Sequence, residues 1–368
     1  MKVGITGING FVGTHLANYL SLQPDITLVP FERSYFDDVK LLQQFVLDCD
    51  TIVHLAGLNR HADPTVILET NIALSQKLIE ACKTTGAKPH ILFSSSTQED
   101  RENDYGLSKK TAREALETWA VQSGATTTGL VIPNVFGPFG HPYYNSVVAT
   151  FCHKIARDES PEIQVDSDIQ LIYVNQLISE IYQYIQKPVQ GRIDIPHQFT
   201  IKVSDLLGKL MSYKALYLDK GEFPALDTPF DLALFNTFRC YIPEEKYPFT
   251  LKLNPDQRGM FVEVVRTGSS GQFSYSTTKP GITRGNHFHT RKAERFAVIQ
   301  GKAKISLRRI GTDHVVDYII DGETPGFVDM PIWHTHNITN IGDTELLTLF
   351  WINEPYNADD PDTYFVNV

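Results

Sequence analysis

The sequence predicts an α/β domain with a doubly wound parallel sheet, followed by an all-β domain. In the first half, short apolar runs alternate with amphipathic helical stretches, which is the pattern of such a sheet. After the polar, proline-bearing segment 244–248, the pattern changes to short alternating strands separated by glycine turns, as in a small β-barrel. We therefore expect one domain at residues 1–246 and a second at 247–368.

Composition narrows the classes of function. The chain has 368 residues, of which 42% are hydrophobic and 21% are charged, so each domain can bury a core. It contains no apolar run of transmembrane length, and a net charge of -10 without a basic block argues against nucleic acid as a partner. Four scattered cysteines, and a first strand with no signal peptide before it, predict a reduced cytoplasmic protein.

The first element is a buried strand, Val3–Gly7, that leads directly into a glycine-rich turn and a helix. Gly7, Gly10 and Gly13 form a GxxGxxG motif, in which glycine allows a tight turn and close approach of the backbone to a ligand. The N-terminus of the following helix attracts a pyrophosphate. The motif alone is weak evidence, but its position directly after the first strand favours a dinucleotide site.

The rest of this half continues the alternation of strand and helix. We expect further strands at residues 26–29, 51–55, 90–93 and 128–132, and helices at 38–46, 64–83, 105–121, 202–213 and 229–235. The fourth strand runs into Ser94-Ser95-Ser96, at the carboxyl edge where such sheets bind ligands. A hydroxyl there can hold a substrate oxygen.

Tyr105 and Lys109 share one face of the helix that follows the serine run. A neighbouring ammonium favours the phenolate and lowers the pKa of a phenol from about 10, so Tyr105 can exchange a proton with a hydroxyl or ketone near neutral pH. Alone, such a pair is explained equally well as part of an exposed helix face. Together with the glycine motif and the serines, it favours a catalytic site.

These segments resemble the extended short-chain dehydrogenase/reductases that act on nucleotide sugars, over about residues 1–245. The family has a Rossmann-like fold, and further matching stretches are residues 53–57, 71–82, 134–138 and 171–174. Val131 and Asn175 depart from the family pattern and leave details of substrate contact open.

The resemblance implies that Tyr105 donates a proton, that Lys109 contacts the nicotinamide ribose, and that Ser96 (or Ser95) holds the substrate carbonyl. It implies cofactor contacts from Gly7, Gly10, Phe11, Val12, Gly13, Leu55, Ala56, Gly57, Asn71 and Lys109. After the second strand, an acid such as Glu32 would bind a free ribose diol, whereas Arg33 could meet a 2′-phosphate. We favour NADPH, because reductive biosynthesis also fits it.

In the second half, His287 and His289 lie two residues apart and are followed by Glu294. On a strand, residues two apart point to one face, and a turn before Glu294 brings back a second strand. His336 precedes another expected hairpin turn. Three imidazoles and one carboxylate suit zinc, iron, nickel or manganese, and we expect zinc. The alternative is that these are surface histidines that bind nothing. An isolated pair of histidines two residues apart would favour that alternative.

The spacing from Gly281 to Gly301 resembles the first cupin motif in full, and implies a jelly-roll barrel. A second cupin motif is kept in part: Pro331 and Asn340 fit, but the usual glycine near Trp333 is missing. The resemblance implies that His287, His289, Glu294 and His336 bind one divalent metal.

Residues 256–263 and 281–287 also resemble the dTDP-4-keto-6-deoxysugar 3,5-epimerases. This implies that Arg258 and Arg284 bind phosphate or sugar oxygens, with two solvated arginines as the alternative. The residue that matches the epimerase base is His287, but a histidine whose lone pair binds a metal cannot take a proton with it. His334 and Tyr356 are candidate bases by position.

The whole chain, including residues 144–157 and 362–365, resembles the CapF/WbjC family of capsular polysaccharide and O-antigen enzymes. The resemblance implies substrate contacts from Asn134, Asn145, Ser146 and Lys154. It implies that the cupin epimerises C3 of UDP-2-acetamido-2,6-dideoxy-4-hexulose, and that the reductase then reduces C4. The product would be UDP-2-acetamido-2,6-dideoxy-L-talose, on the route to UDP-N-acetyl-L-fucosamine. Both component families commonly dimerise, so we expect a homodimer.

Two other functions remain open. A one-step nucleotide-sugar 4-reductase would use the cupin only as a metal-stabilised dimerisation scaffold. A regulatory protein would use the first domain only to sense NADPH. Tyr105, Lys109 and the serine run argue against the sensor, because a sensor needs no proton donor.

Overall fold

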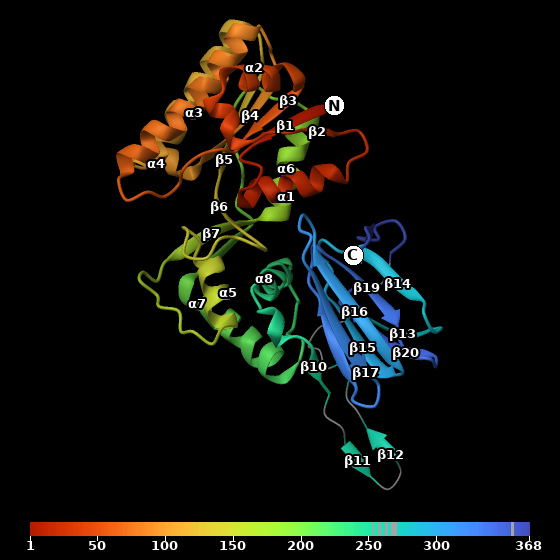
Figure 1. Ribbon diagram of the computed structural model, residues 1–368. Coiled ribbons are helices and arrows are strands. Elements are labelled where there is room, and N and C mark those ends of the chain that lie inside the picture. Colours follow the sequence, from red (N-terminus) through yellow and green to blue (C-terminus); the bar gives the residue numbers. More distant parts are fainter. Residues whose placement is uncertain (252–253, 257–258, 262–263, 266–270, 355–356) are drawn as a thin grey trace. The chain divides into compact units, whose positions relative to one another are not determined.

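Figure 1 shows the computed structural model of the chain, which describes residues 1–251, 254–256, 259–261, 264–265, 271–354 and 357–368. Contacts divide it into two compact units. Unit 1 comprises Met1–Val147 and Ser167–Lys202, and unit 2 comprises Val148–Asp166 and Val203–Val368. The domain boundary predicted after residue 246 concerns where the two proposed activities divide, and it stays a prediction.

Unit 1 is built on a six-stranded sheet in which every neighbouring pair of strands is parallel. In sheet order, its strands are β2 (Thr27–Val29), β1 (Lys2–Thr6), β3 (Thr51–His54), β4 (His90–Ser96), β5 (Thr127–Ile132) and β8 (Gly191–Asp194). A smaller sheet joins β6 (Asn134–Phe136), β7 (Asp168–Tyr173) and β9 (Phe199–Lys202). The predicted doubly wound parallel sheet is confirmed.

Helices cover both faces of the large sheet (Figure 1). One face carries α1 (Phe11–Ser21) and α6 (Val174–Gln186), and the other carries α2 (Val39–Asp48), α3 (Pro64–Thr85) and α4 (Asp104–Ser123). Successive strand residues point to opposite faces, so Ile52 and Val53 of β3 are buried in different cores. This two-sided burial explains why the strands are continuous apolar runs in the sequence.

The sheet order reverses between β1 and β3, because β2 lies on the other side of β1. In open α/β sheets, ligands bind at such a point, outside the carboxyl ends of the strands. Gly7 follows β1 with a φ of +77°, and a Cβ atom there would lie 2.8 Å from the backbone nitrogen of Ala56. Only glycine therefore lets the two loops approach this closely.

Unit 2 contains two five-stranded antiparallel sheets that share an apolar core. In sheet order, the strands of the first sheet are β10 (Phe249–Thr250), β18 (Gly326–Met330), β15 (Glu294–Gln300), β20 (Leu346–Ile352) and β13 (Gln272–Thr278). The strands of the second sheet are β17 (Val315–Asp321), β16 (Lys302–Arg309), β19 (His334–Asn340), β14 (Thr283–Phe288) and β21 (Tyr364–Phe365). A separate hairpin pairs β11 (Asn254–Asp256) with β12 (Gly259–Phe261). The predicted all-β second part is confirmed.

Helical segments belong to the same unit, namely α5 (Val147–Ala156), α7 (Val203–Tyr213), the π-helical turn η3 (Lys214–Leu218) and α8 (Pro229–Arg239). Buried polar contacts join them to the sheets. Tyr217 of η3 donates a hydrogen bond to Asp329 of β18, which also forms an ion pair with Arg295 of β15 at 2.8 Å. The predicted helices at 202–213 and 229–235 are confirmed, and the second is longer than predicted.

Three short 3-10 turns also occur among the described residues, namely η1 (Arg33–Asp37), η2 (Thr97–Asp100) and η4 (Glu244–Lys246).

The four cysteines are free thiols, as predicted, and three of them are buried. No helix among the described residues is both long and apolar enough to cross a membrane.

Candidate functional site

A cavity of about 1030 Å³ lies where the sheet order of unit 1 reverses. Many residues predicted from separate motifs line it together. These are Gly7, Gly10, Phe11, Val12, Gly13, Leu55, Gly57, Ser95, Ser96, Tyr105, Lys109, Asn134, Asn145 and Ser146. The glycine turn, the serine run and the tyrosine–lysine pair therefore face one space.

Tyr105 reaches this cavity because α4 packs closely on the turn η2. Gly106 makes the approach possible, since a Cβ atom there would lie 1.9 Å from the carbonyl oxygen of Gln98. Asn103 caps α4 by accepting a hydrogen bond from the Gly106 N–H at 2.8 Å. The phenol of Tyr105 hydrogen-bonds to the hydroxyl of Ser96 at the cavity wall.

Ser95 and Ser96 differ in their partners. Ser95 donates a hydrogen bond to the buried carboxylate of Glu99, which also accepts from the Arg113 guanidinium at 2.9 Å. Ser96 faces Tyr105 instead, and its oxygen accepts from the backbone of η2 at 3.2 Å. Of the two serines that the sequence left open, the geometry therefore favours Ser96 as the hydroxyl beside the phenol.

Lys109 lies at the cavity wall, one helical turn after Tyr105. Its Nζ donates to the Ser94 carbonyl at 2.9 Å and lies 5.8 Å from the centre of the Tyr105 ring. Burial lowers the pKa of Lys109 to about 8, against the attraction of Glu99. Burial also raises the pKa of Tyr105, against its hydrogen bond with Ser96. The lowered tyrosine pKa expected from the sequence is thus wrong, because burial disfavours the charged phenolate.

Asn71 fixes the loop that follows β3. Its Nδ2 donates to the Leu58 carbonyl and to Ser108 Oγ, both at 2.9 Å, and its Oδ1 accepts from the Leu58 N–H at 2.6 Å. This side chain therefore ties the loop to α4. Ala56 is not among the described residues that line the cavity, and Arg33 is exposed at the start of η1.

Among the further lining residues, Gln98, His141 and Tyr144 were not predicted as site residues from the sequence. Tyr144 is close enough to Tyr105 to contribute to its raised pKa. Gln98 lies in the short turn η2, and His141 and Tyr144 lie between β6 and α5, so no periodicity marks them as functional positions. The predicted contacts Asn145 and Ser146 were the nearby signals, and the Asn145 side chain donates to a backbone carbonyl of the loop after β3 at 2.7 Å.

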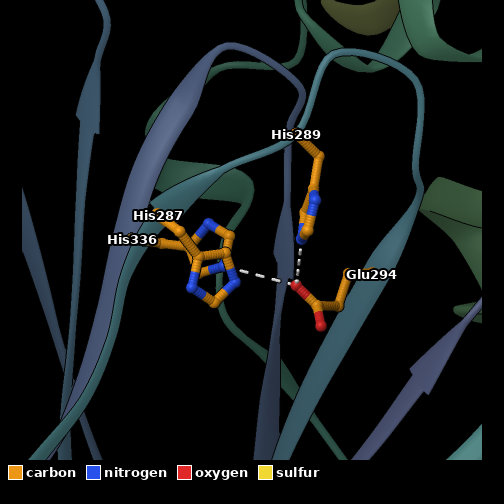
Figure 2. A group of neighbouring side chains, drawn as sticks. All are labelled: His287, His289, Glu294 and His336. Atoms are coloured by element: carbon orange, nitrogen blue, oxygen red, sulfur yellow. Dashed lines mark hydrogen bonds and ion pairs between the residues drawn. The ribbon is translucent and has the colours of Figure 1, made fainter. Parts of the chain in front are cut away.

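The four predicted metal ligands of unit 2 meet in one place (Figure 2). The coordinating atoms of His287, His289, Glu294 and His336 all lie within 4.8 Å of one another. Three of these side chains are buried, and His287 is partly exposed. The predicted turn at 291–293 is confirmed, because it links the end of β14 to Glu294 at the start of β15.

The hydrogen bonds of the cluster fit a bound cation. His289 Nδ1 donates to the carbonyl of Asp362 at 2.5 Å, and His336 Nδ1 donates to that of His334 at 3.2 Å. Because a carbonyl only accepts, both rings direct Nε2 at the Glu294 carboxylate, at 3.2 and 3.3 Å. Two nitrogen lone pairs repel a carboxylate oxygen unless a cation or an added proton lies between them.

The spacing of these atoms also fits a metal. Two ligand atoms about 2.1 Å from a tetrahedral ion lie about 3.4 Å apart. His336 Nε2 is buried and makes no aligned hydrogen bond to any described group. Burial lowers the pKa of His287 to about 4, which keeps its ring neutral, as metal binding requires. Although burial opposes it, the contact with His289 holds the pKa of Glu294 well below its usual range.

A bulge in β14 aims His287 at the cluster. The pairing of β14 with β19 shifts register between Gly285 and His287, and Gly285 and Asn286 have positive φ values of 101° and 59°. Beyond the bulge, His287 lies opposite His336. The alternation expected from the sequence is therefore locally broken, yet the ligands still converge.

The other predicted substrate residues lie elsewhere. Arg284, on β14, donates a hydrogen bond to Thr278 Oγ1 at 3.1 Å. Lys154 lies on α5, which belongs to unit 2, whereas the cavity lies in unit 1. Arg258 and Tyr356 lie outside the described residues.

Comparisons with known proteins match both parts of the chain. Residues 3–199 match the NAD dependent epimerase/dehydratase family, and residues 254–364 match a polysaccharide biosynthesis C-terminal domain. A UDP-2-acetamido-2,6-beta-L-arabino-hexul-4-ose reductase of Pseudomonas aeruginosa is 35% identical over 376 residues, which cover 100% of this chain and 99% of that protein.

The chain also resembles solved structures. The capsular polysaccharide assembling protein CapF of Staphylococcus aureus is 34% identical, with 100% of both chains covered and a TM-score of 0.64. The protein RMD of Pseudomonas aeruginosa, at 21% identity and a TM-score of 0.54, covers 58% of this chain and 85% of its own, and shows the fold alone. The resemblance to CapF predicted from the sequence is confirmed.

Proposed function

This chain belongs to the NAD dependent epimerase/dehydratase family and, over its full length, to the group that contains CapF, and from that premise we propose that it is a bifunctional nucleotide-sugar enzyme. Its second domain, residues 247–368, inverts C3 of UDP-2-acetamido-2,6-dideoxy-4-hexulose. Its first domain, residues 1–246, then reduces C4 with NADPH to give UDP-2-acetamido-2,6-dideoxy-L-talose. The reductase of Pseudomonas aeruginosa supports this substrate class, because its name describes a closely related UDP-4-ketosugar.

In the reduction, Tyr105 acts as the acid. Its raised pKa keeps the phenol protonated near neutral pH, so it can give a proton to the C4 oxygen as negative charge develops there. Ser96, beside the phenol, hydrogen-bonds to the same oxygen. Lys109, whose Nζ is 5.8 Å from the ring centre, stabilises the phenolate that remains. NADPH, when bound, supplies the hydride.

The residues of unit 1 fit a dinucleotide. The glycine turn and the N-terminus of α1 line the cavity, so backbone N–H groups can face a pyrophosphate there. Arg33 is exposed after β2 and supports the choice of NADPH through a 2′-phosphate contact. Asn71 supports the site indirectly, by holding the loop after β3.

In the epimerisation, the 4-keto group makes the proton on C3 removable. His287, His289, Glu294 and His336 would hold one divalent ion, expected to be zinc, which would supply Lewis-acid polarisation of such a ketone. The ligands themselves cannot be the base, because their lone pairs face the ion. His334 is a weak candidate, since burial lowers its pKa to about 4. Tyr356, outside the described residues, is the other candidate.

The observation that carries this proposal is the convergence of Tyr105, Ser96 and Lys109 with the glycine turn on one cavity. The test incubates purified protein with the UDP-ketosugar and NADPH. We expect one equivalent of NADPH to be oxidised for each C4 alcohol formed, with C3 inverted. An unchanged ketosugar in the presence of coenzyme and metal would overturn the proposal.

A one-step 4-reductase whose barrel serves as a scaffold is the second candidate. The burial of three of the four ligands favours it, because structural metal sites are closed. The partial exposure of His287 favours a catalytic site instead, because a catalytic ion needs an open position. For both candidate functions, we propose that the protein is a homodimer and lies in the cytoplasm.

A further inference from the structure

Asp362 lies in the C-terminal segment, against the loop that carries the metal ligands. Its side chain is 3% exposed, and its backbone has a positive φ of 41°. Two residues later, β21 begins and pairs with β14, where Phe365 lies opposite His287. The segment therefore runs along the strand on which the metal motif begins.

The carboxylate of Asp362 holds the turn between two ligands. It accepts hydrogen bonds from the backbone N–H groups of Thr290, Arg291 and Lys292 at 3.1, 3.0 and 3.2 Å, and from the Thr290 hydroxyl at 2.6 Å. Hydrogen bonds to a charged acceptor are roughly twice as strong as neutral ones. Because three successive N–H groups converge on one charge, the turn between the second histidine ligand and the glutamate ligand is fixed.

The backbone carbonyl of Asp362 orients one of the ligands directly. It accepts from His289 Nδ1 at 2.5 Å, so that Nε2 faces Glu294 at 3.2 Å. Such a hydrogen bond fixes both the tautomer and the ring orientation of a metal-binding histidine. One residue from the far end of the domain thus sets both the turn and the ring.

We propose that Asp362 is a positioning residue of the metal site, which holds His289 and the turn 290–292 in their binding arrangement before an ion arrives. This inference rests on the metal site of the proposed function and deepens it. A preset site loses less conformational freedom when the ion binds, so its affinity is higher. Removing the carboxylate should therefore weaken metal binding more than it changes folding.

The test measures zinc affinity of the full-length protein by competition with a chromophoric chelator. Asp362→Asn keeps the size of the side chain and tolerates a positive φ, but it turns an amide donor toward the backbone N–H groups. We expect its zinc dissociation constant to rise about 10- to 100-fold. The visible spectrum of the cobalt-substituted variant should also change, which a purely structural role would not produce.

Asp360→Asn is the matched control. Asp360 lies on the same segment, and its exposed carboxylate pairs with the Arg291 side chain at 2.8 Å rather than with the backbone of the turn. Exposed ion pairs contribute little, so this variant should change the zinc dissociation constant by less than about twofold. If Asp362→Asn fails to fold, Thr290→Val is the milder variant, because it removes only the hydroxyl donor, and we expect an increase of about threefold.

Two outcomes would overturn the inference and leave the metal site intact. One is equal zinc affinity and an equal cobalt spectrum in the wild type and Asp362→Asn. The other is the same weakening in Asp360→Asn as in Asp362→Asn. If the wild type bound no zinc and His289→Ala changed nothing, the metal site of the proposed function would fail, and the inference would fail with it.

Discussion

The two candidate sites differ in how the chain assembles them. The site of unit 1 is a cavity of about 1030 Å³, lined by loops and strand ends from residue 7 to residue 146. The site of unit 2 is a cluster of four side chains whose coordinating atoms lie within 4.8 Å of one another. The first depends on the topology of a parallel sheet. The second depends on the pairing of β14 with β19 and on the turn that leads from β14 to β15 in the other sheet.

This difference predicts different kinds of failure. In the cavity, each catalytic side chain acts on substrate from a rigid helix or strand, so a single substitution should change a rate and spare binding. In the cluster, each ligand shares one ion with three others, so a single substitution should remove the ion first. The predictions below test this contrast.

Tyr105→Phe should have the largest effect. It removes the proton donor but keeps the ring, so kcat for reduction should fall about 10²- to 10⁴-fold while NADPH still binds. NADPH oxidation and a fluorescence titration with NADPH measure the two quantities. Tyr184→Phe, on α6, is the control and should keep its turnover. Unchanged turnover in Tyr105→Phe would remove this residue as the acid.

Glu294→Gln should weaken zinc binding about 100-fold or more, because it removes the only charged ligand of the described cluster. Reduction of a substrate already inverted at C3 should continue at nearly the normal rate. Chelator competition and NADPH oxidation measure the two effects. Glu323→Gln, exposed between β17 and β18, is the control. Equal loss of reduction and zinc binding would break the contrast between the sites.

The pH dependence of reduction should report Lys109. Its pKa is lowered to about 8, so the ammonium is present below that pH and is lost as pH rises through it. We expect kcat/KM for reduction to fall above about pH 8, because the phenolate then loses its neighbouring charge. Lys109→Met should lower the plateau about tenfold and abolish this decline. A wild-type profile that stays flat through pH 8 would contradict the role of Lys109.

Arg33→Ala should have the smallest effect. Loss of an exposed guanidinium should raise the KM for NADPH by about tenfold and leave the KM for NADH unchanged. The ratio of the two kcat/KM values measures the change. If that ratio is the same as in the wild type, Arg33 does not select the coenzyme.

Local motifs were predictable from the sequence because each lies within one short continuous segment. GxxGxxG marks a strand–helix turn, and the Tyr105–Lys109 pair needs only the helical period. Similarly, the segment 287–294 that carries three of the metal ligands needs a strand, a turn and the start of a second strand. All of these elements are found where the sequence predicted them, within a few residues. The serine run forms the end of β4, as predicted.

Long-range contacts were not predictable. Asp362 reaches the turn 290–292 only because β21 pairs with β14, and nothing near Asp362 in the sequence reveals that pairing. The pKa of Tyr105 is raised by burial, so the neighbouring lysine gave the wrong direction. Gln98 and Tyr144 line the cavity from a short 3-10 turn and a loop, where the sequence has no repeating pattern.

The most direct test of two separate activities is proton NMR in heavy water, with the UDP-4-ketosugar and zinc present and NADPH omitted. Without a hydride donor, reduction cannot occur, so any change at C3 reports the epimerase alone. We expect the C3 proton to exchange for deuterium with the wild type and with Tyr105→Phe, but not with Glu294→Gln. Absence of exchange in the zinc-loaded wild type would contradict the bifunctional account and leave a one-step reductase.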